Sequence, residues 1–60
     1  EGPVYTVLEE IGPDHDKMYL VEVRMGDGEV LGTGSGRSKK QAEQRAAEEG
    51  VKKLSVRSDS

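Results

Sequence analysis

Apolar and polar residues alternate most regularly between residues 18 and 25. The apolar side of this stretch consists of Tyr19, Val21, Val23 and Met25. A period of two residues is typical of a strand with one buried and one solvated face. β-branched and aromatic side chains behind a proline predict another strand over residues 3–11. The sequence Gly-Asp-Gly at 26–28 is a hairpin signal, so residues 29–35 are expected to return as a third antiparallel strand.

The period changes to that of a helix after residue 37. Ser38 is a favourable N-cap residue, and Gln41 three positions later completes a capping-box pattern. The small and apolar residues that follow fall in one half of the helical wheel: Ala42, Ala46, Ala47, Gly50, Val51 and Leu54. Because this face is mostly Ala and Gly, a helix over residues 38–54 can approach a sheet closely. Gly32 and Gly34 share one face of the third strand, which predicts close packing there.

Together these elements predict an α+β fold of order β-β-β-α, a three-stranded antiparallel sheet with the C-terminal helix packed on one face. We expect one domain over residues 1–55 and a disordered tail over residues 56–60. A single Ala-rich helix is a thin cover for three strands, so this fold is expected to need a second helix. The sequence contains none, and we therefore expect a domain truncated at its N-terminus.

Composition argues against several kinds of site. The 60 residues include no cysteine and one histidine, His15, which disfavours disulfides, a thiolate nucleophile and a structural zinc site. Asp14, His15 and Asp16 are neighbours in a loop, and adjacent loop residues rarely converge on one ion without further ligands. No nucleophile, base and orienting group occur together. We therefore predict a binding module with no catalytic residue, no metal and no cofactor.

Composition also bears on the partner. No apolar run approaches the ~20 residues of a membrane span, so we expect a soluble, cytoplasmic protein with no membrane contact. Tyr5 and Tyr19 are the only aromatic residues. Proteins that bind single-stranded nucleic acid use several aromatic platforms for base stacking, so this composition argues against such a function.

Charge is distributed unevenly along the chain. The formal net charge is −3, but residues 1–31 hold eight acidic and two basic side chains, whereas residues 32–60 hold seven basic and four acidic ones. Binding to a polyanion depends on where the charge lies rather than on its sum. The basic C-terminal half therefore keeps nucleic acid among the candidate ligands.

Arg37, Lys39 and Lys40 gather positive charge at the start of the predicted helix. The helix macrodipole disfavours each cation there by ~0.3–1 kcal/mol, and a bound phosphate would remove the conflict. An ordinary solvated charge cluster is the alternative. Residues 32–40 match neither the nucleotide P-loop nor the dinucleotide-binding fingerprint. The phosphate ligand that remains is a polymer backbone.

Two stretches of the sequence resemble the double-stranded RNA-binding domain family. GTGSGRSKKQAEQRAAEEGVKKL, residues 32–54, is similar to the family's last strand and second helix, and IGPDHDKMYLVEV, residues 11–23, to its first loop and second strand. The nearest variant is the C-terminal domain of bacterial ribonuclease III. The resemblance covers about residues 3–54. It implies binding to double-stranded RNA by its A-form shape, as the substrate-binding module of a double-strand-specific endoribonuclease.

The resemblance also implies a set of RNA-binding residues. The helix start would contact phosphates across the major groove, and the first loop would enter a minor groove. The residues at these two places are Pro13, Asp14, His15, Arg37, Ser38, Lys39 and Lys40. The sequence departs from the family at Glu43, where lysine is frequent, and nothing in it matches the family's N-terminal helix.

A second function stays open beside RNA binding. A fold of this family can serve protein association or dimerisation, and the acidic N-terminal half and the uncovered sheet favour that role. The exposed basic helix start disfavours it. The resemblance to ribonuclease III also allows a homodimer that forms through the catalytic domain of the parent chain.

Overall fold

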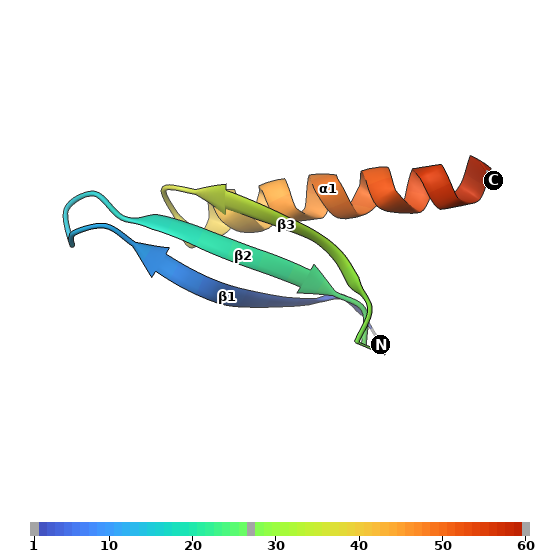
Figure 1. Cartoon of the computed structure of the whole chain (residues 1–60), viewed down its shortest axis with the longest axis horizontal. Coiled ribbons are helices and arrows are strands. Elements are labelled where there is room, and N and C mark those ends of the chain that lie inside the picture. The colour runs from blue at the N-terminus through green and yellow to red at the C-terminus, as the bar shows by residue number, and fades with distance from the viewer. Residues whose placement is uncertain (1, 27, 60) are drawn as a thin grey trace.

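Three strands and one long helix make up the fold (Figure 1). The computed structural model describes residues 2–26 and 28–59. Its elements are β1 (Val4–Ile11), β2 (Met18–Arg24), β3 (Val30–Gly36) and α1 (Lys39–Asp59). The predicted β-β-β-α order is confirmed, and both ends of each strand lie within one residue of the prediction.

The sheet is antiparallel with the order β1-β2-β3, so β2 is its central strand. Val21 of β2 pairs with Val7 of β1 and with Gly34 of β3. Since paired residues point to the same face, the apolar side of β2 lies between apolar side chains of β1 and the glycines of β3. The β1–β2 register shifts between Val7 and Glu9. This irregularity explains why residues 3–11 alternate less cleanly than β2.

The core lies between β2, β3 and one side of α1. Its buried apolar residues are Val21, Val23, Leu31, Ala42 and Ala46. A Cβ atom at Gly32 would lie 2.7 Å from the backbone nitrogen of Gly50, and one at Gly34 would collide with the backbone of Ala46. The predicted close packing is confirmed, because the backbones of α1 and β3 touch where β3 has no side chains.

β1 is uncovered along its whole length, and all eight of its residues are exposed. Tyr5 and Val7 pair with Val23 and Val21, so they lie on the same face of the sheet as α1. However, α1 lies over β3 and β2 and leaves Tyr5 and Val7 40% and 36% exposed. This helix alone therefore covers two of the three strands.

The buried row of α1 is narrower than the sequence predicts. The row that packs on the sheet contains Ala42, Ala46 and Gly50, all of them buried. Val51 belongs to the predicted apolar face, yet it is 63% exposed. It lies one turn beyond Ala47, which lines an open groove beside Tyr5, and no element in the described part of the chain covers it. The side chain of Leu54 lies outside the described residues.

α1 is longer than predicted. It ends at Asp59, so residues 56–59 are helical where the sequence predicts a disordered tail. Residues 51–59 contain no glycine or proline, the two residue types that most disfavour a helix. Ser60 lies outside the described residues. In the part of the chain that the structure describes, no helix is long and apolar enough to cross a membrane.

Candidate nucleic-acid interface

The start of α1 is fixed by reciprocal hydrogen bonds. The Gln41 N–H donates to Ser38 Oγ at 3.1 Å, and the Arg37 N–H donates to Gln41 Oε1 at 2.8 Å. The predicted capping pattern is therefore present, with the glutamine reaching one residue further back than in the usual capping box. These bonds hold the backbone from which the Lys39 and Lys40 side chains leave the helix.

Lys39 and Lys40 are exposed in the first turn of α1, which contains no acidic residue. Within the described ranges, no carboxylate lies at ion-pair distance from either lysine. The helix dipole adds positive potential at this end. An anion bound here would meet the ammonium groups and the helix-terminal N–H groups together.

The loop between β1 and β2 is shaped by its backbone. Gly12 has a φ of 101°, which residues with a side chain rarely adopt. A Cβ atom at Gly12 would lie 2.5 Å from the carbonyl oxygen of Asp16. The Asp16 N–H donates to the Pro13 carbonyl at 2.9 Å and closes a turn. His15 lies within this turn and is exposed.

Lys17 ties the loop to β1. Its Nζ lies 3.0 Å from Glu10 Oε1 and 3.7 Å from Asp14 Oδ1. The hydrogen bond to Glu10, followed by the charge of the same carboxylate, raises the pKa of Lys17 above its ordinary value. The ion pair with Glu10 therefore holds the base of the loop against the end of the strand.

A polar pocket of about 240 Å³ lies between this loop and the start of α1. Its lining residues are Asp14, His15, Asp16, Lys17, Tyr19 and Arg37. Arg37 Nη1 lies 4.0 Å from Asp16 Oδ1. The structure therefore places side by side the two segments that the sequence analysis selected separately.

The predicted RNA-binding residues take different positions around this pocket. Three of them line it: Asp14, His15 and Arg37. Lys39 lies beside it, with its Nζ 6.0 Å from the centroid of the Tyr19 ring. Lys40 lines a separate groove between α1 and Tyr5 of β1. Pro13 and Ser38 form bonds within the protein, Pro13 as the turn acceptor and Ser38 as the helix cap.

The two loop carboxylates face cations. Asp14 lies 3.7 Å from Lys17, and Asp16 lies 4.0 Å from Arg37. In the residues that the structure describes, no three side chains of His, Cys, Asp or Glu come together in an arrangement that could hold a metal ion.

Sequence reasoning missed Asp16, Lys17 and Tyr19 as parts of this site. Alternation places Tyr19 on the buried face of β2. The only sequence signal that Tyr19 also belongs to the site is the predicted pairing of β2 with β3. This pairing brings Tyr19 opposite Gly36, the residue before Arg37. Asp16 and Lys17 reach their partners through the turn that begins at Gly12, and residue spacing does not reveal that turn.

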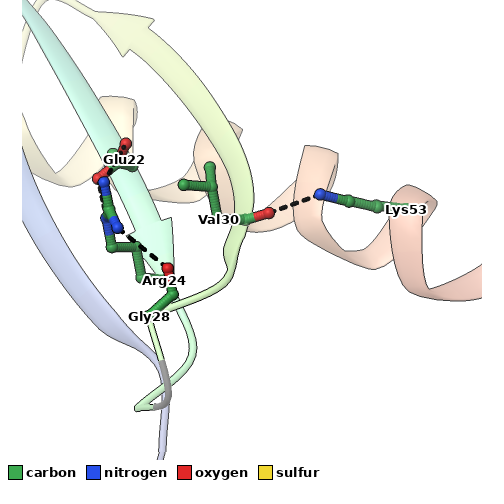
Figure 2. A network of polar contacts seen from close by, with 5 residues as sticks. All are labelled: Glu22, Arg24, Gly28, Val30 and Lys53. Carbon is green, nitrogen blue, oxygen red and sulfur yellow. Dashed lines mark hydrogen bonds and ion pairs between the residues drawn. The ribbon is translucent and has the colours of Figure 1, made fainter.

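Other basic side chains of α1 bind the protein itself. Lys53 Nζ donates to the Val30 carbonyl at 2.6 Å (Figure 2). Arg45 Nη1 donates to the Ser35 carbonyl at 3.0 Å. Both carbonyls belong to β3, the outer strand beside the helix. These two cations therefore satisfy backbone acceptors at the edge of the sheet.

Arg24 on β2 is also bound within the protein. Its Nε donates to Glu22 Oε1 at 2.5 Å, and its Nη1 donates to the Gly28 carbonyl at 3.0 Å (Figure 2). This side chain links the central strand to the β2–β3 turn. In contrast to these internal contacts, the lysines of the first turn of α1 face solvent.

The chain matches a known family over nearly its whole length. The family model for the double-stranded RNA binding motif matches residues 1–54. The chain therefore belongs to the double-stranded RNA binding motif family, in agreement with the resemblance seen in residues 11–23 and 32–54.

Curated relatives share about half of their residues with the chain over the matched region. The chain is 52% identical to Ribonuclease 3 of Caldanaerobacter subterraneus subsp. tengcongensis over 52 residues, which are 87% of the chain and 22% of the relative. It is 53% identical to Ribonuclease 3 of Natranaerobius thermophilus over 55 residues, 92% of the chain and 24% of the relative. The chain therefore spans less than a quarter of the length of these relatives.

Proposed function

We propose that the chain binds double-stranded RNA and recognises its A-form shape with little sequence preference. The observation that carries this proposal is the placement of an exposed His15 loop and a basic helix start around one polar pocket. Membership of the double-stranded RNA binding motif family supports the same ligand.

The start of α1 supplies the phosphate contacts in this proposal. Lys39 and Lys40 extend from a capped helix end without a carboxylate partner in the described ranges. The Arg37 side chain is 79% exposed beside Asp16, so it can reach a phosphate. The Ser38 hydroxyl accepts one hydrogen bond as the helix cap and still has its own proton to donate.

The β1–β2 loop supplies the minor-groove contacts. The minor groove of A-form RNA is wide and shallow and displays 2′-hydroxyl groups, which both donate and accept hydrogen bonds. His15 and the residues before it, Pro13 and Asp14, are exposed and can meet such groups. The turn at Gly12 and the Lys17–Glu10 ion pair fix the loop before RNA arrives.

We further propose that the chain is the substrate-binding module of a ribonuclease III and has no catalysis of its own. The relatives named Ribonuclease 3 match it at 52% and 53% identity. Since the match covers 22% and 24% of these relatives, the catalytic groups of such an enzyme would lie in other parts of the longer protein.

Removing two charges from the helix start tests the RNA interface. We expect the double variant Lys39→Ala/Lys40→Ala to abolish binding to an RNA duplex of about 20 base pairs, because both proposed phosphate contacts are lost. Any residual binding should show a salt dependence reduced by about two in the slope of log affinity against log salt. Fluorescence anisotropy with a labelled duplex measures both quantities, and a DNA duplex of the same sequence should bind more weakly.

The matched control is Lys52→Ala/Lys53→Ala, which removes the same charge from the same helix. Lys52 pairs with Glu49 and Lys53 with the Val30 carbonyl, so neither belongs to the proposed interface. This control should keep most of the affinity. Undiminished RNA binding by the Lys39→Ala/Lys40→Ala protein, with an unchanged circular dichroism spectrum, would overturn the proposed interface.

One observation favours protein association as a second candidate function. β1 exposes large apolar side chains, namely Val4, Tyr5, Val7, Leu8 and Ile11. Exposed apolar patches can mark protein interaction sites. Sedimentation at several concentrations, with and without duplex RNA, separates the two candidates. A concentration-dependent dimer that ignores RNA would support association in place of RNA binding.

A further inference from the structure

Tyr19 lies between the two halves of the proposed interface. Its ring lines the polar pocket together with His15 and Arg37. The Lys39 ammonium sits over the ring, with Nζ 6.0 Å from the centroid. At about this distance the negative face of an aromatic ring attracts a cation. Among the described residues, Lys40 has no ring in a comparable position.

The Tyr19 ring is itself firmly placed. Tyr19 belongs to the central strand and pairs with Glu10 on one side and Gly36 on the other. It is half-buried and packs against the core cluster that contains Val21. A tyrosine has few rotatable bonds, so a ring held in this way is a rigid support for a flexible neighbour.

We propose that Tyr19 is a positioning residue for RNA binding, whose ring holds the Lys39 ammonium beside the pocket where Lys39 meets a phosphate. The inference rests on the proposed function. A lysine side chain loses much rotamer freedom when it is fixed in a complex, and restraint in the free protein lowers that cost. The ring also offsets part of the repulsion between Lys39 and the helix dipole.

A double-mutant cycle separates this role from a general effect on the fold. Tyr19→Leu is introduced into three backgrounds: the wild-type chain, Lys39→Ala and Lys40→Ala. Affinity for an RNA duplex is measured with and without Tyr19→Leu in each background. We expect Tyr19→Leu to weaken binding about two- to fivefold in the wild-type chain, the size of an exposed cation–π contact. The same loss should occur in the Lys40→Ala background, and none should occur in the Lys39→Ala background.

Tyr19→Phe is the conservative variant. It keeps the ring and removes the hydroxyl, so we expect it to retain the wild-type affinity. A Tyr19→Phe protein as weak as Tyr19→Leu would overturn the proposal, because the hydroxyl rather than the ring would then matter. An equal loss on Tyr19→Leu in the Lys39→Ala and Lys40→Ala backgrounds would also overturn it, since a structural defect acts in both.

A measurement on the wild-type chain covers the case in which Tyr19→Leu does not fold. The aromatic ring should shift the NMR signals of the Lys39 ε-methylene protons upfield relative to those of Lys52, which lines a groove without an aromatic residue. Equal shifts for Lys39 and Lys52 would contradict the Lys39–Tyr19 contact. If the wild-type chain binds no RNA duplex, the proposed function fails, whereas this NMR comparison still decides whether the ring holds Lys39.

Discussion

Lys39 and Lys53 are lysines of the same helix with different surroundings. Lys53 reaches back to the Val30 carbonyl at 2.6 Å, whereas the Lys39 ammonium lies over the Tyr19 ring beside the polar pocket. The bond to Val30 uses one of the three N–H donors of Lys53 and holds the ammonium at the edge of β3. The position of a basic residue on the helix, rather than its type, therefore decides whether it is available to RNA.

Glu10 and Lys17 give a prediction at the residue scale. We expect Glu10→Gln to lower the pKa of Lys17 toward its ordinary value, because the hydrogen bond and charge of Glu10 raise it. A pKa raised in the folded state adds stability below the unfolded value, and this contribution is lost as pH rises through the folded value. The wild-type chain should therefore lose this contribution to stability at alkaline pH, above lysine's ordinary pKa of 10.5. The variant should lack the part of it that comes from Glu10.

An NMR titration that follows the Lys17 side chain measures this change. Glu9→Gln is the control, because it removes the neighbouring carboxylate, which is not among the groups that raise the pKa of Lys17. The control should titrate as the wild-type chain does. A Lys17 titration that is the same in Glu10→Gln and the wild type would contradict the prediction.

At the scale of elements, β3 and α1 depend on each other. β3 carries glycines on the side that faces the helix, and α1 presents alanines and Gly50 in return. The helix backbone therefore lies directly on the strand. This closeness brings the end of β3 and the first turn of α1 together and places Arg37 near the β1–β2 loop.

Gly34→Ala tests the contact between these elements. An added Cβ atom would meet the backbone of Ala46 and Arg45, which cannot move aside as a flexible side chain can. We expect a loss of at least about 1–3 kcal/mol in the free energy of unfolding, the usual cost of overpacking. Chemical denaturation measures it. Gly2→Ala is the matched control, since nothing lies within 4 Å of a Cβ at Gly2, and equal stability of the two variants would contradict the packing described.

At the scale of the whole molecule, burial is concentrated on one side of the sheet. The two layers meet over β2 and β3, and β1 stands apart from the helix (Figure 1). Among the residues whose burial the structure describes, the core consists of five apolar residues, the largest of them Val21, Val23 and Leu31. A domain of 60 residues has a small margin of stability, so single core side chains carry much of it.

Two valine-to-alanine variants measure this asymmetry. Val21 is fully buried and Val4 is 53% exposed. We expect Val21→Ala to lower the free energy of unfolding by about 2 kcal/mol, through lost apolar burial and the cavity left behind. Val4→Ala should cost well under about 1 kcal/mol, because a half-exposed side chain leaves no cavity. Urea denaturation of both proteins checks the difference, and similar losses would contradict a core confined to β2, β3 and α1.

Much of the fold and part of the site could be predicted from the sequence. The strand period, the Gly-Asp-Gly turn and the Ser38–Gln41 cap are local signals, since each acts within a few residues. They correctly predicted the order of the elements and the start of α1. α1 continues beyond residue 54, where the sequence analysis ended the helix, because residues 51–59 contain no glycine or proline that would stop it.

The sequence by itself determined the elements, the close approach of helix and strand, and the basic charge of the helix start. Tertiary structure alone decided which residues surround the pocket, that the Lys39 ammonium lies over the Tyr19 ring, and that Val51 is exposed. These features depend on strand register and on the lateral position of α1 over the sheet. Both are set by the packing of residues far apart in the chain, which no local period or spacing encodes.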